Sequence, residues 1–110
     1  MNNLLNNNNC EVLGSDIGSE RAFVEAHNPE VFYIKPDVDV SEWITKSTLK
    51  LDENGQTFLV QEPGSLVVSL LTHSHILIAD IDRADETQLK LITQVVEANP
   101  NTQFAFTLMG

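Results

Sequence analysis

The fold is decided by ILIADIDRADETQLKLITQVVEANPNTQFAFTLM, residues 76–109. It opens with ILIAD, a continuous apolar run of the kind that is buried on both faces of a parallel sheet. A helix follows, which Asp85 can cap and whose apolar side chains recur at helical spacing: Leu89, Ile92, Val95 and Val96. An Asn-Pro break and FAFTLM then predict a further strand. This order with short linkers is typical of a parallel α/β sheet with right-handed crossovers.

The residues upstream also predict helices that are followed by strands. VFYIK, residues 31–35, is rich in β-branched and aromatic residues and predicts a strand. A helix expected from Ser19 to Ala26 precedes it, and Pro63 suits the first turn of another helix that runs through Leu71. The sequence therefore predicts an α/β fold, a three-layer parallel sheet of about four strands with flanking helices. We expect the strands near residues 11–14, 31–35, 76–80 and 103–108, with 76–80 in the centre.

A β-hairpin is expected as an insertion before the helix that ends at Leu71. Leu49 and Leu51 alternate with polar neighbours before Asn54 and Gly55, and Phe58 and Val60 lie two residues apart after them. An Asn-Gly pair between two alternating runs is a strong hairpin signal. We place the hairpin at residues 48–60 and expect it to project from the sheet.

Composition and charge narrow the possible functions. The chain has 110 residues, enough for one core, and 16 acidic against 6 basic side chains give a net charge of −10. Such a surface repels phosphate backbones and anionic lipids, which argues against direct nucleic-acid binding and a membrane role. The binding partners that remain possible are cations, basic proteins, or a ligand in a local pocket. The N-terminus lacks the features of a signal peptide and no apolar run could span a bilayer, so we expect a cytoplasmic protein.

The N-terminal segment has few apolar side chains that a core could bury. Six of the first nine residues are Asn, and we expect residues 1–9 to be a flexible leader before a single domain at 10–110. Cys10 is the only cysteine, so an internal disulfide is impossible. We expect an inert thiol near the start of the first strand, because no helix N-terminus or histidine nearby in sequence would lower its pKa.

Polar residues at the carboxyl ends of parallel strands are the first candidates for chemistry. Asp80 and Asp82 follow ILIA, where an aspartate can hold Mg²⁺ or accept a phosphoryl group. The alternative is that Asp80 only ends the strand and that Arg83 pairs with either aspartate. His73 and His75 precede the same strand at its amino end and lack a third ligand for a metal. His27 is expected to be a surface residue that ends a helix.

The stretch from Trp43 to Gly110 resembles the AAA+ ATPases of the MoxR and midasin-like branch, most of all the ATPase subunit of cobaltochelatase. The matching features are LKLDENGQTFLV as a hairpin, PGSLVVSLL as the helix before the Walker B strand, ILIADIDRADETQ as that strand and its sequel, and FAFTLMG at the sensor 1 position. Upstream, VLGSDIGSE falls where the Walker A loop should be. The resemblance implies a P-loop NTPase-like fold and a nucleotide site at Gly14, Gly18, Ser19 and Asp80, with Asp80 on Mg²⁺.

The departures from this family's pattern predict that the site is vestigial. Ser19 and Glu20 stand where the Lys-Ser/Thr pair of the phosphate loop would fall, and Ile81 replaces the catalytic glutamate. The sensor strand offers Thr107, but Met109 lies where a polar sensor is expected. Hydrolysis needs a polarised water and compensated phosphate charge, so we expect no ATPase activity and no cofactor, with Mg-ATP binding weakly if at all.

Two other readings stay open. A receiver-like pseudo-domain would use Asp80 as its phosphoacceptor, but the acidic pair expected after the first strand is reduced to Asp16, and the hairpin is unexplained. A small acidic inhibitor or immunity-type protein would block a basic partner through charge. The first third of the chain concentrates acidic residues for that role: Glu11, Asp16, Glu20, Glu25 and Glu30. The expected function is a non-catalytic AAA+-like module that binds an AAA+ neighbour or a basic protein, with self-association possible.

Overall fold

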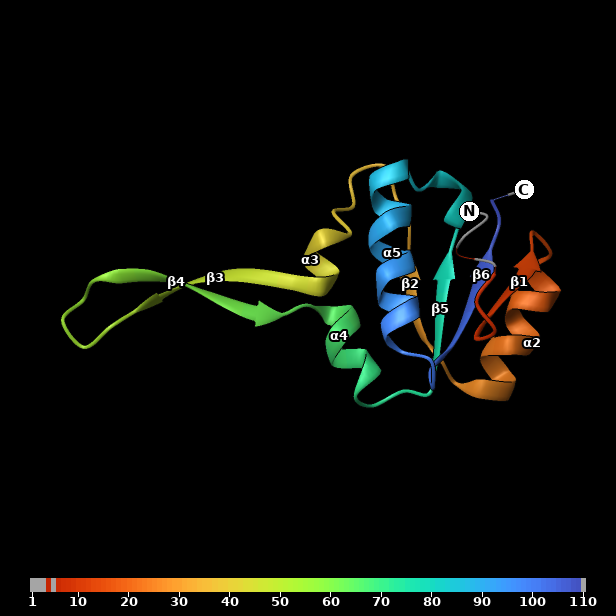
Figure 1. Cartoon of the computed structure of the whole chain (residues 1–110), viewed down its shortest axis with the longest axis horizontal. Helices are drawn as coiled ribbons and strands as arrows, with labels where there is room; N and C mark the ends of the chain where they lie inside the picture. Colours follow the sequence, from red (N-terminus) through yellow and green to blue (C-terminus); the bar gives the residue numbers. More distant parts are fainter. Residues whose placement is uncertain (1–3, 5, 110) are drawn as a thin grey trace.

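The computed structural model describes residue 4 and residues 6–109 and has an α/β fold (Figure 1). Four parallel strands form the main sheet in the order β1-β6-β5-β2. The strands are β1 (Cys10–Gly14), β2 (Glu30–Tyr33), β5 (His75–Ala79) and β6 (Gln103–Thr107). The predicted fold class is confirmed, and ILIAD supplies an interior strand, because β5 lies between β6 and β2.

Helices flank this sheet on both faces. They are α2 (Ile17–His27), α3 (Ser41–Ile44), α4 (Ser65–Leu70) and α5 (Glu86–Ala98), with a 3₁₀ turn, η1, at Ile81–Arg83. Side chains alternate along the strands, so Ile76 and Ile78 of β5 join the large core with α5, whereas Leu77 packs with Phe23 of α2 on the opposite face. None of the described helices is long and apolar enough to cross a lipid bilayer.

The two long helices begin at acidic caps. Asp85 caps α5 as predicted: its carboxylate accepts from the Gln88 N–H at 2.8 Å, and the Gln88 side chain accepts from the Asp85 N–H at 2.9 Å. The predicted cap of α2 is wrong. Asp16, not Ser19, is the N-cap, and the helix starts at Ile17. The Asp16 carboxylate accepts from the Gly18 N–H, so the cap lies three residues earlier in the chain than predicted.

The insertion is an antiparallel hairpin of β3 (Thr45–Leu51) and β4 (Thr57–Pro63), longer than the predicted 48–60. It extends far from the sheet (Figure 1). The molecule measures 54 × 27 × 23 Å and its radius of gyration is 15.8 Å. A compact chain of this length would have about 13 Å. The predicted projection of the hairpin is therefore confirmed.

The hairpin turn is built differently from a two-residue Asn-Gly turn. The Asp52 carboxylate accepts from the N–H groups of Asn54 at 2.9 Å and Gln56 at 2.8 Å, and only Gly55 takes a left-handed φ, of +79°. A three-residue loop with glycine in the left-handed position results. The Asn-Gly signal located the turn correctly, but Asp52 organises it.

Gly64 joins the hairpin to α4. Pro63 is the last residue of β4 and not part of the helix, which corrects the predicted helix start. A Cβ atom at Gly64 would lie 2.2 Å from the carbonyl carbon of Trp43. Only glycine therefore fits where the base of the hairpin passes the end of α3.

The N-terminal segment packs more than expected. Leu4 is 1% exposed within the large core, and the Asn9 side chain donates to the carbonyls of Val96, Asn99 and Thr102 at 3.0–3.3 Å. The prediction of a flexible leader is wrong for Leu4 and Asn9, because tertiary contacts hold both. The rest of that prediction includes residues 1–3 and 5, which lie outside the described residues.

Candidate functional site

Two of the predicted site residues lie at the carboxyl edge of the sheet. Gly14 pairs with Thr107 across β1 and β6, and the N–H of Asp80 donates to the Thr107 hydroxyl at 3.0 Å. Thr107 is 5% exposed. The structure therefore brings Gly14 and Asp80 to one edge, on either side of a buried threonine.

Gly18 and Ser19 form part of a helix cap. Only Ser15 and Asp16 separate β1 from α2, and the Asp16 carboxylate accepts from the Gly18 N–H at 3.0 Å and from the Ser19 hydroxyl at 3.3 Å. The N–H groups of Ser19 and Glu20 donate to the Asp16 carbonyl. A carboxylate thus occupies the place that an anion would take at this helix N-terminus.

Asp80 and its neighbours are tied to the end of β6. Asp80 has a left-handed backbone, φ +61° and ψ +43°. Asp82 accepts from the N–H of Met109 at 2.9 Å, and the Arg83 guanidinium contacts the Met109 sulfur. Within residues 4 and 6–109, no ion pair joins Arg83 to either aspartate, so that expectation is wrong.

The strand order bears on the receiver reading. In chain order the main sheet runs first, fourth, third, second. Receiver domains have the flavodoxin-like order 2-1-3-4-5, in which the first and third strands are neighbours. Here β6 separates β1 from β5, so Asp16 and Asp80 follow strands that are not adjacent. The receiver alternative is therefore wrong.

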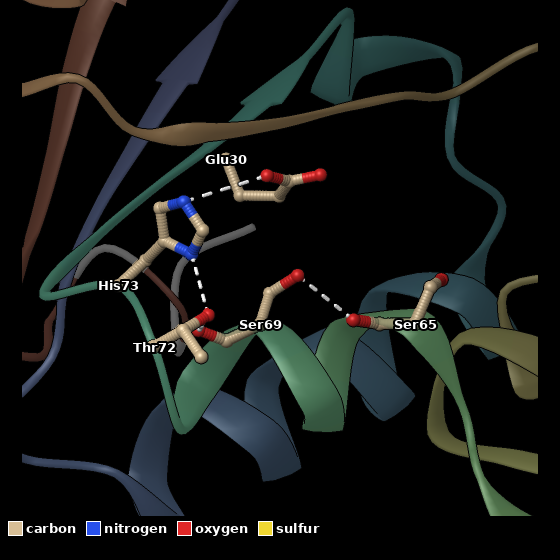
Figure 2. Close-up of polar contacts among 5 residues, drawn as sticks. All are labelled: Glu30, Ser65, Ser69, Thr72 and His73. Atoms are coloured by element: carbon tan, nitrogen blue, oxygen red, sulfur yellow. Dashed lines mark hydrogen bonds and ion pairs between the residues drawn. The ribbon is translucent and has the colours of Figure 1, made fainter.

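A hydroxyl, an imidazole and a carboxylate line up at the amino edge (Figure 2). Thr72 Oγ1 lies 2.8 Å from His73 Nδ1, and His73 Nε2 lies 3.6 Å from Glu30 Oε2. This is the order of groups in a nucleophilic site. However, the Thr72 hydroxyl also bonds the Ser69 carbonyl at 3.3 Å, and the carboxylate is beyond hydrogen-bond distance. The chain of contacts ties the end of α4 to the start of β2.

A second histidine contact lies at the same edge and was not foreseen. The rings of His27 and His75 stack with centroids 4.2 Å apart, and the Phe23 ring lies 4.8 Å from the first and 5.9 Å from the second. Burial, and then the nearby His27, lower the pKa of His75, against a smaller opposing effect of Glu11. His27 is exposed and is the last residue of α2, as predicted, and its ring contact with His75 also ties the end of α2 to β5. Sequence alone held no signal for this contact, because the two histidines are 48 positions apart.

Within the described part of the chain, no group of three or more His, Cys, Asp or Glu residues could hold a metal ion. Cys10 is the first residue of β1, and burial raises the pKa of its thiol to about 11. At neutral pH that thiol is protonated and a poor nucleophile, consistent with the inert thiol that the sequence predicts.

The hairpin presents an uncharged face with three exposed leucines. Leu49 and Leu59 are direct cross-strand partners, and Leu51 is next on the same side; all three are 67–69% exposed. We call the side of the hairpin that carries these leucines the leucine face; its other members are Thr45, Ser47, Thr57, Gln61 and Pro63. The opposite side carries all the charges of the two strands, including the Lys50–Glu62 ion pair at 2.9 Å.

No protein-family model, no curated protein and no solved structure matches the chain.

Proposed function

We propose that this protein is a non-catalytic module that binds another protein through the leucine face of its hairpin. We call the main sheet and its helices the body of the molecule. The observation that carries the proposal is the exposure of Leu49, Leu51 and Leu59 on a hairpin that extends away from this body (Figure 1). Exposed apolar side chains that lie together on one surface mark interaction sites. A two-stranded hairpin is also only marginally stable without something packed on it.

The carboxyl edge supports the absence of catalysis in this proposal. The Asp16 carboxylate bonds the first turn of α2, and Glu20 is in the same turn. Bound phosphate would meet negative charge there instead of free N–H groups and a lysine. Phosphoryl transfer depends on compensating that charge, so the edge is a poor site for it.

The AAA+ relationship belongs to the proposal as well. The succession of hairpin, short helix, buried strand, long helix and strand from β3 to β6 is the one that the resemblance of residues 43–110 implies. On this view the edge with Gly14, Gly18, Ser19 and Asp80 is a vestigial nucleotide site, and the hairpin is the part that still functions.

Pull-down from the native host tests the proposal with matched variants. Leu49→Ser with Leu59→Ser removes apolar surface from the leucine face, and Leu71→Ser removes a leucine that is 83% exposed at the end of α4. We expect the wild type and Leu71→Ser to retain the same protein and the double variant to lose it. Equal retention by all three proteins would contradict the proposal, as would micromolar binding of Mg-ATP in calorimetric titration.

A second candidate function rests on the surface of α2. A shallow hollow of about 510 Å³ is lined by Glu20, Arg21, Glu25, Tyr33 and the exposed Ile17, among others. Two carboxylates against one arginine leave the hollow with a net negative charge, which suits a lysine or arginine of a basic partner, as an acidic inhibitor would need. Binding of that kind weakens steeply as salt rises, whereas binding through the uncharged leucine face does not.

A further inference from the structure

The charge of the molecule is distributed unevenly between the hairpin and the body. Residues 45–63 contain two lysines and three carboxylates, a net charge of −1, which leaves −9 of the total −10 on the remaining residues. Two bodies of this charge repel each other. Two hairpins do so only weakly, and their leucine faces carry no charge at all.

We propose that the partner of the leucine face is a second copy of this chain, with the two hairpins packed face to face about a two-fold axis. This inference rests on the proposed function and names its partner. An uncharged face offers nothing to a basic protein, but a two-fold axis places Leu49, Leu51 and Leu59 against the same three leucines. The leucine face of one copy then packs its apolar side chains against those of the other copy.

Packing of this kind also completes the hairpin. Two ribbons stacked about 10 Å apart form a four-stranded sandwich with a small leucine core. Three or more strands, or a packed face, are what an isolated hairpin needs for independent stability. Lys50 and Glu62, on the opposite side, stay in water as an ion pair.

The length of the hairpin decides how the two copies are oriented. Strands of seven residues are about 24 Å long. With the two-fold axis perpendicular to the strands, the bodies lie at opposite ends, separated by well over the Debye length of about 8 Å at physiological ionic strength. An axis along the strands would bring the two bodies, each of charge −9, together. The first arrangement is therefore the one we expect.

Analytical ultracentrifugation of the full chain over a range of concentrations tests the dimer. We expect a monomer–dimer equilibrium whose association constant changes less than about threefold, or rises, between low and high salt. Leu49→Ser with Leu59→Ser should lower that constant by more than about a hundredfold, since four leucines leave the interface. Leu71→Ser, outside the leucine face, should leave it unchanged. A dimer that survives the double substitution would overturn the proposal.

Cross-linking keeps the test valid if the double variant loses its hairpin. In a Cys10→Ser background, Leu59→Cys should give a covalent dimer with a short bis-maleimide, and Lys50→Cys on the opposite side should not. Equal cross-linking of both would overturn the face-to-face arrangement. A chain that stays monomeric yet retains a different protein through the leucine face refutes the dimer and leaves the proposed function standing. A monomer that retains no protein refutes both.

Discussion

Asp80 takes a backbone conformation that few residues other than glycine adopt, with φ +61°. Aspartate tolerates this region, whereas a β-branched side chain does not. We expect Asp80→Val to lower the free energy of unfolding by about 1–2 kcal/mol, and Asp80→Gly to change it by less than about 1 kcal/mol. Urea denaturation measures both. Equal losses in the two variants would mean that the carboxylate, not the backbone, matters at this position.

The reactivity of the half-buried Cys10 thiol can be predicted from its pKa. Its pKa is about 11, against a usual 9.0, so at pH 8 the folded protein holds roughly a hundredfold less thiolate than the unfolded chain. Alkylation by iodoacetamide should be slower in the native protein by about that factor. Rates followed by mass spectrometry with and without urea give the comparison. Similar rates in both states would contradict the buried environment of this thiol.

Gly64 is the position where three elements converge, at the end of β4 and the start of α4 beside α3. A methyl group there would overlap the Trp43 backbone, which cannot rotate away as a side chain could. We expect Gly64→Ala to destabilise the protein by about 2–3 kcal/mol or more. Gly55→Ala is the control, because only its left-handed φ is strained and no atom lies within 4 Å. It should cost about 1 kcal/mol.

The stacked histidines make the docking of α2 sensitive to acid. Because the pKa of folded His75 lies below its usual 6.5, the unfolded chain binds more protons as pH falls through that value. The stability gained from neutral His75 is therefore present at higher pH and lost below about 6.5. Thermal melting at several pH values should show a smaller decrease in His75→Phe, which keeps an aromatic ring but does not titrate. An unchanged pH slope in that variant would exclude His75 as the cause.

Local signals in the sequence predict most of the main sheet. The strand at 76–80 was placed within one residue of β5 because apolar, β-branched runs carry their own signal. The start of α2 was missed because Asp16 and Ser19 are both good caps, and sequence does not rank them. Asn9 was misjudged because the carbonyls that hold it lie at the distant end of α5 and just beyond it, and Leu4 because it joins a core built from residues far along the chain. Local pattern describes an element well and its tertiary partners poorly.

Some features of the candidate site could be predicted from the sequence, and others required the folded structure. Gly14 and Asp80 could be assigned to one edge, because the carboxyl ends of parallel strands share it. That Thr107 lies between them follows from the order of the strands, which the pattern of apolar residues does not specify. The meeting of His27 with His75 likewise needs the closed fold. The leucines of the hairpin were visible in the sequence as an alternating run, but their exposure depends on what the body leaves uncovered.

At the scale of the whole molecule, the body and the hairpin are separable in energy. Among the described residues, no buried hydrophobic side chain of the core lies between positions 45 and 63. The hairpin approaches the body only at its base, where Trp43 and Leu66 enter the core on either side of it. Its removal should therefore take little apolar burial away from the body.

Replacing residues 47–61 with a short Gly-Ser linker tests this separation. The variant keeps Gly64 and both short helices, so we expect the free energy of unfolding to change by no more than about 1 kcal/mol, within the range of surface substitutions and loop-length effects. Small-angle scattering at low concentration should give a radius of gyration near 13 Å instead of 15.8 Å, because the remaining chain has the dimensions of a compact domain. A variant that unfolds, or keeps the larger radius, would show that the hairpin supports the body. A folded, compact variant would leave binding to a partner as the reason for the exposed leucines of the hairpin.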